Sequence, residues 1–295
     1  MAGLESASEY RPRRKVHKPE KAASPVQPAA GRRLQRVLTG IVTQVEGDLR
    51  RIGGFPEGGI HSLRRRMKKL QPILALARGQ VPRQTRLRIK RHLRLLKDAF
   101  AGRRDADVMH RLAVELGVPE HALAGPLFAR TPRVIINARH WRAASKLRQL
   151  VCCPGLDSLT WDKVARAFLR NARRERKAWR LASAGHSVEL LHAWRRSLKA
   201  HHYQMLLVHR LTGRMQRRLR LADSLGRWLG KYHDLELLAS WLRPATCKQC
   251  KRIGKEIWRR QRKLQRRIFR TAAQLHDQTR VKGARRLAQD LAAAD

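Results

Sequence analysis

Residues 60–70 read IHSLRRRMKKL and hold one histidine, three arginines and two lysines without a single carboxylate. At the period of an α-helix this segment separates into two faces. One face is apolar and extends one turn further along the chain: Ile60, Leu63, Met67, Leu70 and Leu74. The opposite face is polar and cationic: His61, Arg64, Arg65 and Lys68. The segment therefore predicts a helix that buries one side in a core and presents positive charge on the other.

The same pattern recurs later in the chain, where residues 191–201 read LHAWRRSLKAH. The polar positions of the first segment have identical residues there: His192, Arg195, Arg196 and Lys199. A second pair of segments also matches: FAGRRDADV at 100–108 and LGKYHDLEL at 229–237. The two pairs follow the same order, and the copies of each are separated by nearly the same number of residues. Two ordered matches indicate an internal duplication of a helical unit.

Both copies place like charges four residues apart, Arg64 with Lys68 and Arg195 with Lys199. Such a pair destabilises a helix by about 0.2–0.5 kcal/mol, whereas an ordinary solvated face mixes both signs. A solvated face is the alternative interpretation. Because both copies keep this destabilising pair of like charges, the pattern favours a face that binds an anion.

Other predicted helices carry the same kind of charge. In residues 86–100 three arginines share the face opposite the apolar residues: Arg88, Arg91 and Arg94. Arg217 and Arg220 match two of them in the second half of the chain. A further segment at 163–179 adds five cations: Arg166, Arg170, Arg173, Arg174 and Lys177. Helices that pack through their apolar arcs would present a basic wall or channel, which concentrates its field on an anionic ligand.

Positive charge extends over the whole chain, which has 295 residues with 67 Lys and Arg against 22 Asp and Glu, a formal charge of +45. A compact chain with this charge repels itself, so we expect a polyanionic partner: nucleic acid, an anionic membrane surface or an inorganic polyanion. Hydrophobic residues make up 42%, enough for a sizeable core. The sequence contains neither an apolar run long enough to span a membrane nor an N-terminal stretch typical of a signal peptide. We therefore expect a cytoplasmic protein without membrane insertion.

Apolar residues recur at helical spacing from Arg32 onward, and Gly and Pro fall between the segments. The predicted helices lie near 33–52, 58–79, 84–101, 105–117, 133–151, 161–182, 187–212, 214–230, 234–243 and 249–276. The predicted class is all-α, with helices joined by short loops as in bundles. The predicted divisions are a disordered tail at 1–31, one domain at 32–285 with halves at about 32–155 and 156–285, and a C-terminal tail at 286–295.

The acidic residues beside the basic segments have a structural explanation. Asp105 precedes an apolar-periodic run and Asp107 falls in its first turn, so N-capping and the helix dipole account for both. Asp234 and Glu236 repeat that arrangement in the second half. Ion pairs that orient neighbouring cations are the alternative.

Four cysteines occur as an adjacent pair, Cys152 and Cys153, and as a Cys-x-x-Cys pair, Cys247 and Cys250. Such residues can bind zinc or cycle as a redox pair. Adjacent cysteines are poorly spaced for a four-sulfur zinc site, and no thioredoxin-like strand pattern surrounds the second pair. The pattern favours incidental thiols, and we expect neither a metal nor another cofactor.

These motifs resemble those of the CHAD family, the conserved-histidine α-helical domains. Its members carry a duplicated His-x-Leu-Arg-x-x-x-Lys-Arg helix and a later Leu-Gly-x-x-Arg-Asp-x-Asp-Val element, or a variant ending in Asn-Asp. The first helix motif falls on His61, Leu63, Arg64, Lys68 and Lys69, and its copy falls on His192, Trp194, Arg195, Lys199 and Tyr203. The later element corresponds to residues 104–108 and, in degenerate form, to His233 and Asp234. The resemblance covers about residues 32–285, with departures at Gln71, Ala200 and His202, and Pro72 is expected to kink the first motif helix.

The resemblance implies two four-helix bundles related by a pseudo-two-fold axis, with a basic central surface or channel between them. It also implies binding of inorganic polyphosphate there, since family members bind this polymer and some locate to polyphosphate granules. The predicted polyphosphate-binding residues are His61, Arg64, Arg65, Lys68, Lys69, Arg88, Arg91, Arg94, His192, Arg195, Arg196, Lys199, His202, Arg217 and Arg220. Histidines among many cations should be neutral in the free protein and should protonate more readily once phosphate binds, which predicts tighter binding at mildly acidic pH.

RNA or DNA binding by the same basic surface is the first alternative. Single-strand binders usually add exposed aromatic platforms, and aromatic residues make up only 5% of this chain. Trp194, Trp228 and Trp241 fall on or beside apolar arcs, which leaves Trp141 and Tyr203 as candidates for exposed aromatics.

A phosphohydrolase that uses His233 and Asp234 is the second alternative. Such an enzyme needs several more His and Asp ligands around divalent ions, and carboxylates are scarce here. His201 falls on the apolar arc of its helix, a position typical of a core residue rather than a general base. We therefore expect a protein that is not an enzyme.

Overall fold

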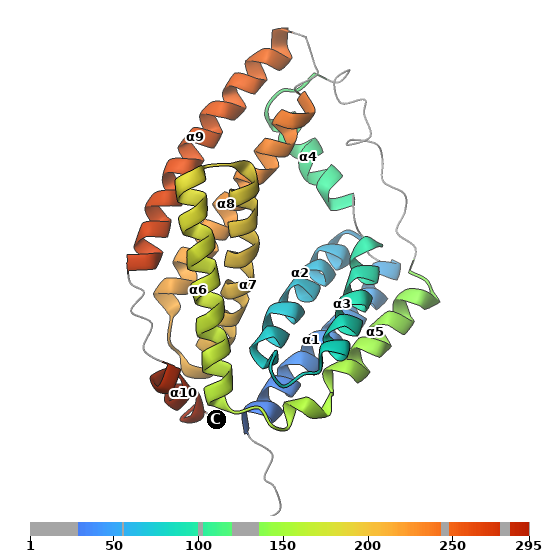
Figure 1. Ribbon diagram of the computed structural model, residues 1–295. Helices are drawn as coiled ribbons and strands as arrows, with labels where there is room; N and C mark the ends of the chain where they lie inside the picture. The colour runs from blue at the N-terminus through green and yellow to red at the C-terminus, as the bar shows by residue number, and fades with distance from the viewer. Residues whose placement is uncertain are drawn as a thin grey trace, which may run out of the picture.

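The computed structural model describes residues 29–54, 56–99, 103–119, 136–242, 248–277 and 284–294. Within these ranges the chain forms ten α-helices and no strand (Figure 1). The predicted all-α class is confirmed. Most of the segment predicted as an N-terminal tail, residues 1–28, lies outside the described ranges. Across the described part of the chain, none of the helices has the length and apolar character needed to cross a bilayer.

Four helices pack together in the first part of the chain: α1 (Ala29–Gly54), α2 (Pro56–Leu74), α3 (Arg83–Asp98) and α5 (Ala138–Val151). α1 packs against α2 and α5, and α3 packs against α5 and α2. The packing buries the apolar arc of α2, since Leu63, Met67 and Leu70 are at most 1% exposed. Burying a side chain of this size contributes about 1.5–3 kcal/mol, so the core fixes which face of α2 points outward.

Four further helices form a second group: α6 (Trp161–Gly185), α7 (Val188–Thr212), α8 (Gln216–Leu242) and α9 (Lys248–Asp277). Each packs against the next along the chain. Trp194 is fully buried, as predicted, and its indole N–H donates to the buried carboxylate of Glu175 at 2.7 Å. His201 is also buried in this core, with its ring centroid 4.8 Å from that of Phe168. Burial lowers the pKa of His201 to about 4, so the ring is neutral at pH 7, as the core prediction requires.

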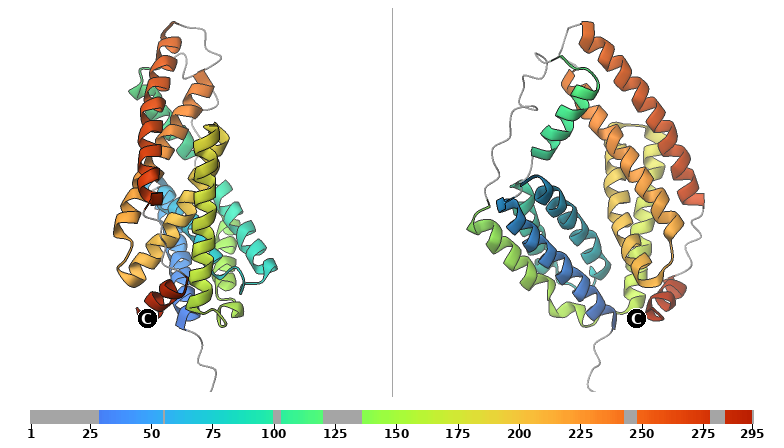
Figure 2. Two further views of the ribbon diagram at one scale, coloured as in Figure 1. Left: turned by 60° about the vertical axis from the view of Figure 1, so that its left-hand side comes forward. Right: turned by 180° about the vertical axis from the view of Figure 1, so that it is seen from behind.

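The two groups meet where α2 packs against α7 (Figure 2). Pro72 lies inside α2, which ends two residues later at Leu74 and continues as a 3-10 turn at Ala75–Ala77. Because proline has no N–H, it cannot continue the regular hydrogen-bond ladder of the helix. The Pro72 carbonyl accepts a hydrogen bond from the Gln204 side chain of α7 at 2.7 Å. This bond joins the groups across what we term the α2–α7 seam.

The first part of the chain also reaches the second group through α4 (Arg103–Glu115), which packs on α8. α4 begins at Arg103, so Asp105 lies in its first turn and is not the N-cap residue. The side chains of Asp105 and Asp107 lie outside what the structure describes.

The predicted break between helices at 214–230 and 234–243 is wrong, because α8 runs without interruption from Gln216 to Leu242. Residues 231–233, Lys-Tyr-His, contain neither Gly nor Pro and continue the helix. Asp234 and Glu236 therefore lie inside α8, and the N-cap role predicted by analogy with Asp105 and Asp107 does not apply to them. The Glu236 carboxylate instead accepts a hydrogen bond from Gln261 of α9 at 2.7 Å.

The segment predicted as a C-terminal tail contains a helix, α10 (Ala284–Ala292), which packs on α6 and α7. Leu287 and Leu291 recur one turn apart, and both are at most 5% exposed. This short apolar pair is enough to dock the helix, although it gives too few repeats to be recognised as periodic. The pseudo-two-fold relation between the halves stays a prediction.

Candidate functional site

A cleft of about 390 Å³ opens where α1, α2 and α7 meet. Four cations line it: Arg33 and Arg36 of α1, Lys69 of α2 and Arg210 of α7. Tyr203 and Gln44 add polar groups, and the remaining lining residues are apolar or glycine. Among the described residues that line it, none is a carboxylate. We term this site the seam cleft.

Helix periodicity explains how each wall of the seam cleft forms. Arg33 and Arg36 lie one turn apart, beside the buried positions Leu34 and Leu38. Gly40 continues the same wall one turn further, and a Cβ built there would meet no heavy atom within 4 Å. The cleft is therefore open above Gly40, with arginines at one end of the α1 wall.

Among the described residues, those that shift the pKa of Lys69 are all cations. Burial lowers its pKa, and the nearby guanidinium groups of Arg210, Arg65 and Arg66 lower it further. Both causes disfavour the ammonium form, so a bound anion would relieve the repulsion and stabilise the charged lysine. Lys69 thus marks a place where positive charge is concentrated, with no carboxylate in the described lining of the cleft.

His202 lies beside the same cluster. Burial lowers its pKa, and Lys199 of its own helix and Lys69 of α2 lower it further, while Asp223 of α8 opposes them. The free protein therefore holds this imidazole neutral near pH 7, as predicted for histidines among cations. Burial also raises the pKa of Tyr203, with an opposing effect from Arg65, so its hydroxyl stays a hydrogen-bond donor.

The structure brings four of the predicted residues to the seam: Arg65, Lys69, Lys199 and His202. Arg66, between Arg65 and Met67 in sequence, has a different role. Its Nε donates to the carboxylate of Asp48 at 2.5 Å, and the Asp48 side chain is fully buried in α1. Arg66 therefore ties α2 to α1 rather than facing a ligand.

A second set of predicted residues lies further along the same helices. The ring centroids of His192 and His233 are 4.7 Å apart, which places His192 against α8. Burial is the largest cause that lowers the pKa of His192. The nearby His233, Arg196 and Arg195 lower it further. On α2, Arg64 lies close enough to Lys97 of α3 to lower the pKa of that lysine, for which burial is the larger cause.

Of the fifteen predicted residues, only Lys69 lines the seam cleft itself. Arg88, Arg91 and Arg94 are exposed on α3, and Arg217 and Arg220 are exposed on the first turns of α8. His61 is exposed and Lys68 half-buried on α2. None of these seven residues lines the seam cleft.

Three cations of the seam cleft were not predicted: Arg33, Arg36 and Arg210. A sequence signal exists for each of them. Arg33 and Arg36 share a helical face at the start of the predicted helix 33–52, and Arg210 continues the His202–Tyr203 face two turns further. The sequence does not show that these faces lie next to one another, because they belong to three different helices.

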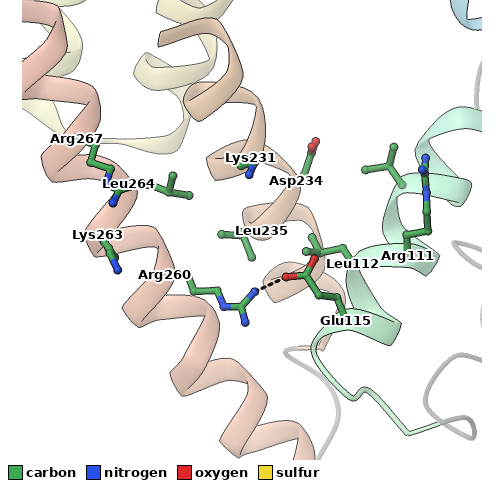
Figure 3. Close-up of a pocket in the computed structure, with 11 residues that line it drawn as sticks. Arg111, Leu112, Glu115, Lys231, Asp234, Leu235, Arg260, Lys263, Leu264 and Arg267 are labelled. Carbon is green, nitrogen blue, oxygen red and sulfur yellow. Dashed lines mark hydrogen bonds and ion pairs between the residues drawn. The ribbon is translucent and has the colours of Figure 1, made fainter. Parts of the chain in front are cut away.

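A larger cleft of about 540 Å³ lies between α4, α8 and α9 (Figure 3). We term it the α4–α9 cleft. Five cations line it: Arg111, Lys231, Arg260, Lys263 and Arg267. Its walls also include two carboxylates, Glu115 and Asp234. Arg260 donates to Glu115 at 2.7 Å and to Glu256 at 3.0 Å, and these bonds raise the pKa of Arg260. Part of the positive charge here is compensated within the protein, because Arg260 is paired with two carboxylates.

Metal and thiol chemistry were the other possibilities raised by the sequence. Among the described residues, no group of three or more His, Cys, Asp or Glu side chains is placed to hold a metal ion. Cys152 is exposed and Cys153 buried, and both are free thiols. Burial raises the pKa of Cys153, which disfavours its reactive thiolate form. Cys250 is disulfide-bonded, so the prediction of an incidental thiol is wrong for it. Cys247 lies outside the described residues.

Comparison with known protein families identifies a match. The model of the CHAD domain family matches residues 32–243. No curated protein matches the chain. The matched segment contains α2, α7 and every residue of the seam cleft, and it stops before α9.

Proposed function

The chain belongs to the CHAD domain family, and we propose that it binds inorganic polyphosphate at the seam cleft. The observation that carries the proposal is the convergence of Arg33, Arg36, Lys69 and Arg210 from three helices on a cleft whose described lining has no carboxylate. Polyphosphate is a flexible chain with about one negative charge per phosphate and no bases. Guanidinium forks bind such oxygens in pairs, and an ammonium group serves as a point charge.

The seam suits a polymer better than a single phosphate. Arg65 and Lys199 extend the positive charge along α2 and α7 beyond the cleft, and the neutral His202 lies beside them. His192 and Arg195 continue it towards α8, where the Arg195 guanidinium comes within 3.8 Å of the place where a Cβ on Gly230 would lie. A chain of phosphates that leaves the cleft would therefore meet further cations along its path. In this proposal the seam is the basic central surface that the resemblance implies.

We further propose that the protein binds polyphosphate without cleaving it. The described lining of the cleft offers cations, a phenol and an amide, whereas hydrolysis needs a general base or a metal-activated water. Incubation with long-chain polyphosphate and magnesium should release no orthophosphate beyond a protein-free control. Release that depends on the protein would overturn this part of the proposal.

In the cell we propose a cytoplasmic protein that polyphosphate granules recruit through the seam. A fluorescent fusion should coincide with granules stained for polyphosphate. A fusion with Lys69→Glu and Arg210→Glu should be diffuse. Granule localisation that survives both changes would show recruitment by another route.

Competition between polyanions tests the central proposal against its alternative, binding of RNA or DNA at the same surface. Long-chain polyphosphate, single-stranded RNA and duplex DNA would be titrated against one another at about 150 mM salt, close to physiological ionic strength. At equal phosphate concentration, polyphosphate should displace both nucleic acids from the seam. Displacement of polyphosphate by either nucleic acid would favour the alternative.

A further inference from the structure

α9 is the most basic helix of the second group, and it follows the segment that defines the family. It runs along the outer edge of that group and packs against α8 and α6 (Figures 1 and 2). Its cations outnumber its carboxylates, which are only Glu256 and Asp277. The seam lies on the other side of α6 and α7 (Figure 1). The polyphosphate site proposed above therefore does not account for the charge of α9.

The outward face of α9 has a regular pattern. Five residues at spacings of three and four share it: Lys251, Lys255, Trp258, Arg262 and Arg266. All five are exposed, and they span about 22 Å along the helix axis. Like charges four residues apart, such as Lys251 with Lys255, disfavour the helix in isolation. The buried residues of α9, including Ile253, Ile257 and Ile268, lie on the opposite side.

Trp258 lies in the middle of this basic stripe and is 56% exposed. Among the described residues, it is the only aromatic side chain among the large hydrophobic side chains classed as exposed. Trp141, a candidate for an exposed aromatic in the sequence, is half-buried, and Trp228 and Trp241 are half-buried as well. The guanidinium carbon of Arg262 lies 5.0 Å from the centroid of the Trp258 indole. The indole is thus held by a cation on an otherwise solvated face.

We propose that this face of α9 binds single-stranded nucleic acid, with a base stacked on Trp258 and the phosphates paired with the flanking Lys and Arg residues. Base stacking on aromatic side chains within a basic surface, with arginine adding cation–π contacts, is the general way in which single strands are bound. Polyphosphate has no base to stack, and a duplex hides the faces of its bases. Both the charge and the aromatic group of this face therefore match a single strand best.

The proposal is independent of the polyphosphate site, so each can fail alone. The probe is a fluorescein-labelled oligouridylate of about 16 nucleotides, within the footprint of single-strand binders, measured by fluorescence anisotropy. Trp258→Ala in the full chain should weaken its binding by about fivefold or more, because a stacked base is lost. Trp258→Phe should restore most of the affinity. The affinity of Trp258→Ala for long-chain polyphosphate should not change.

Two further variants separate this face from the rest of the molecule. Leu181→Ala removes another exposed apolar side chain, 50% exposed on α6, and should leave both affinities unchanged. Lys69→Glu with Arg210→Glu should lose polyphosphate and keep the oligouridylate. The proposal is overturned if Trp258→Ala binds the oligouridylate as tightly as the unaltered chain. It is also overturned if Trp258→Ala loses both ligands equally, or if the seam variant loses the oligouridylate as strongly as polyphosphate.

Discussion

The seam cleft and the α4–α9 cleft are built from the same kinds of side chain, yet they differ in how their cations are compensated. In the α4–α9 cleft, Arg260 of α9 is shared between Glu115 and Glu256, and Asp234 lies on the α8 wall. The described lining of the seam cleft has no carboxylate, and the pKa of Lys69 is lowered by burial and by neighbouring arginines. The larger cleft has ion pairs of its own, whereas the described lining of the smaller one offers none to its cations. This difference, and not volume, is why we propose the seam cleft as the polyanion site.

Charge reversal should separate the two clefts most strongly. Lys69→Glu with Arg210→Glu removes two cations that converge on one ligand, and polyphosphate affinity should fall by about a hundredfold or more, since each hydrogen bond to a charged group contributes about 1.5–3 kcal/mol. The matched control, Lys263→Glu with Arg267→Glu, changes the same charge in the α4–α9 cleft and should have a much smaller effect. Binding would be measured by anisotropy with end-labelled polyphosphate, and circular dichroism would check helicity. Equal losses in both variants would mean that only net charge matters.

Reversal further along the seam should have an intermediate effect. Arg64 and Arg195 lie on the predicted faces of α2 and α7 but do not line the cleft. Arg64→Glu with Arg195→Glu should therefore lower polyphosphate affinity by about tenfold, through the outer part of the polymer path. Short polyphosphate that fits within the cleft should lose less affinity than long chains. A variant that binds long chains as tightly as the unaltered protein would remove these residues from the site.

The fold was largely predictable because it depends on local periodicity. The apolar arc of α2 is buried as the helical wheel predicts, and so is Trp194 of α7. The predicted helix boundaries were wrong where the sequence signal for a helix end was weak. Asp234 resembles an N-cap residue in sequence, yet continuous packing on α9 and α4 keeps α8 helical through it.

The site was less predictable because it depends on which faces meet. The duplicated motif identifies Arg65 and Lys69, but its neighbour Arg66 has the same charge and a structural partner, the buried Asp48. Only the packing of α1 on α2 distinguishes Arg66 from Arg65 and Lys69. Arg33 of α1 and Arg210 of α7 complete the cleft from outside the motif, more than a hundred residues apart in sequence.

A new carboxylate should weaken the seam cleft without removing any cation. Gly40 lies on its α1 wall, where a Cβ meets no heavy atom within 4 Å. Gly40→Glu should reduce polyphosphate affinity by roughly fivefold, whereas the nearly isosteric Gly40→Gln should have little effect. Both variants should unfold at a slightly higher temperature, because either residue is a better helix former than Gly by about 0.5 kcal/mol. If the Gly40→Glu and Gly40→Gln variants bind polyphosphate equally, the charge on the α1 wall does not contribute to polyphosphate affinity.

Acidification should strengthen binding at the seam by a few-fold, the smallest of these effects. In the free protein the pKa of His202 is lowered by burial and by Lys199 and Lys69, with Asp223 opposing, so the ring is neutral near pH 7. Bound phosphates supply negative charge that raises this pKa, so the complex takes up a proton that the free protein does not. Affinity should therefore rise as the pH falls below neutrality, because protonation of His202 is coupled to phosphate binding. His202→Gln keeps a polar side chain that does not titrate, and it should flatten the pH profile while changing affinity little at pH 7.5. Affinity that decreases on acidification would place His202 away from the bound phosphates.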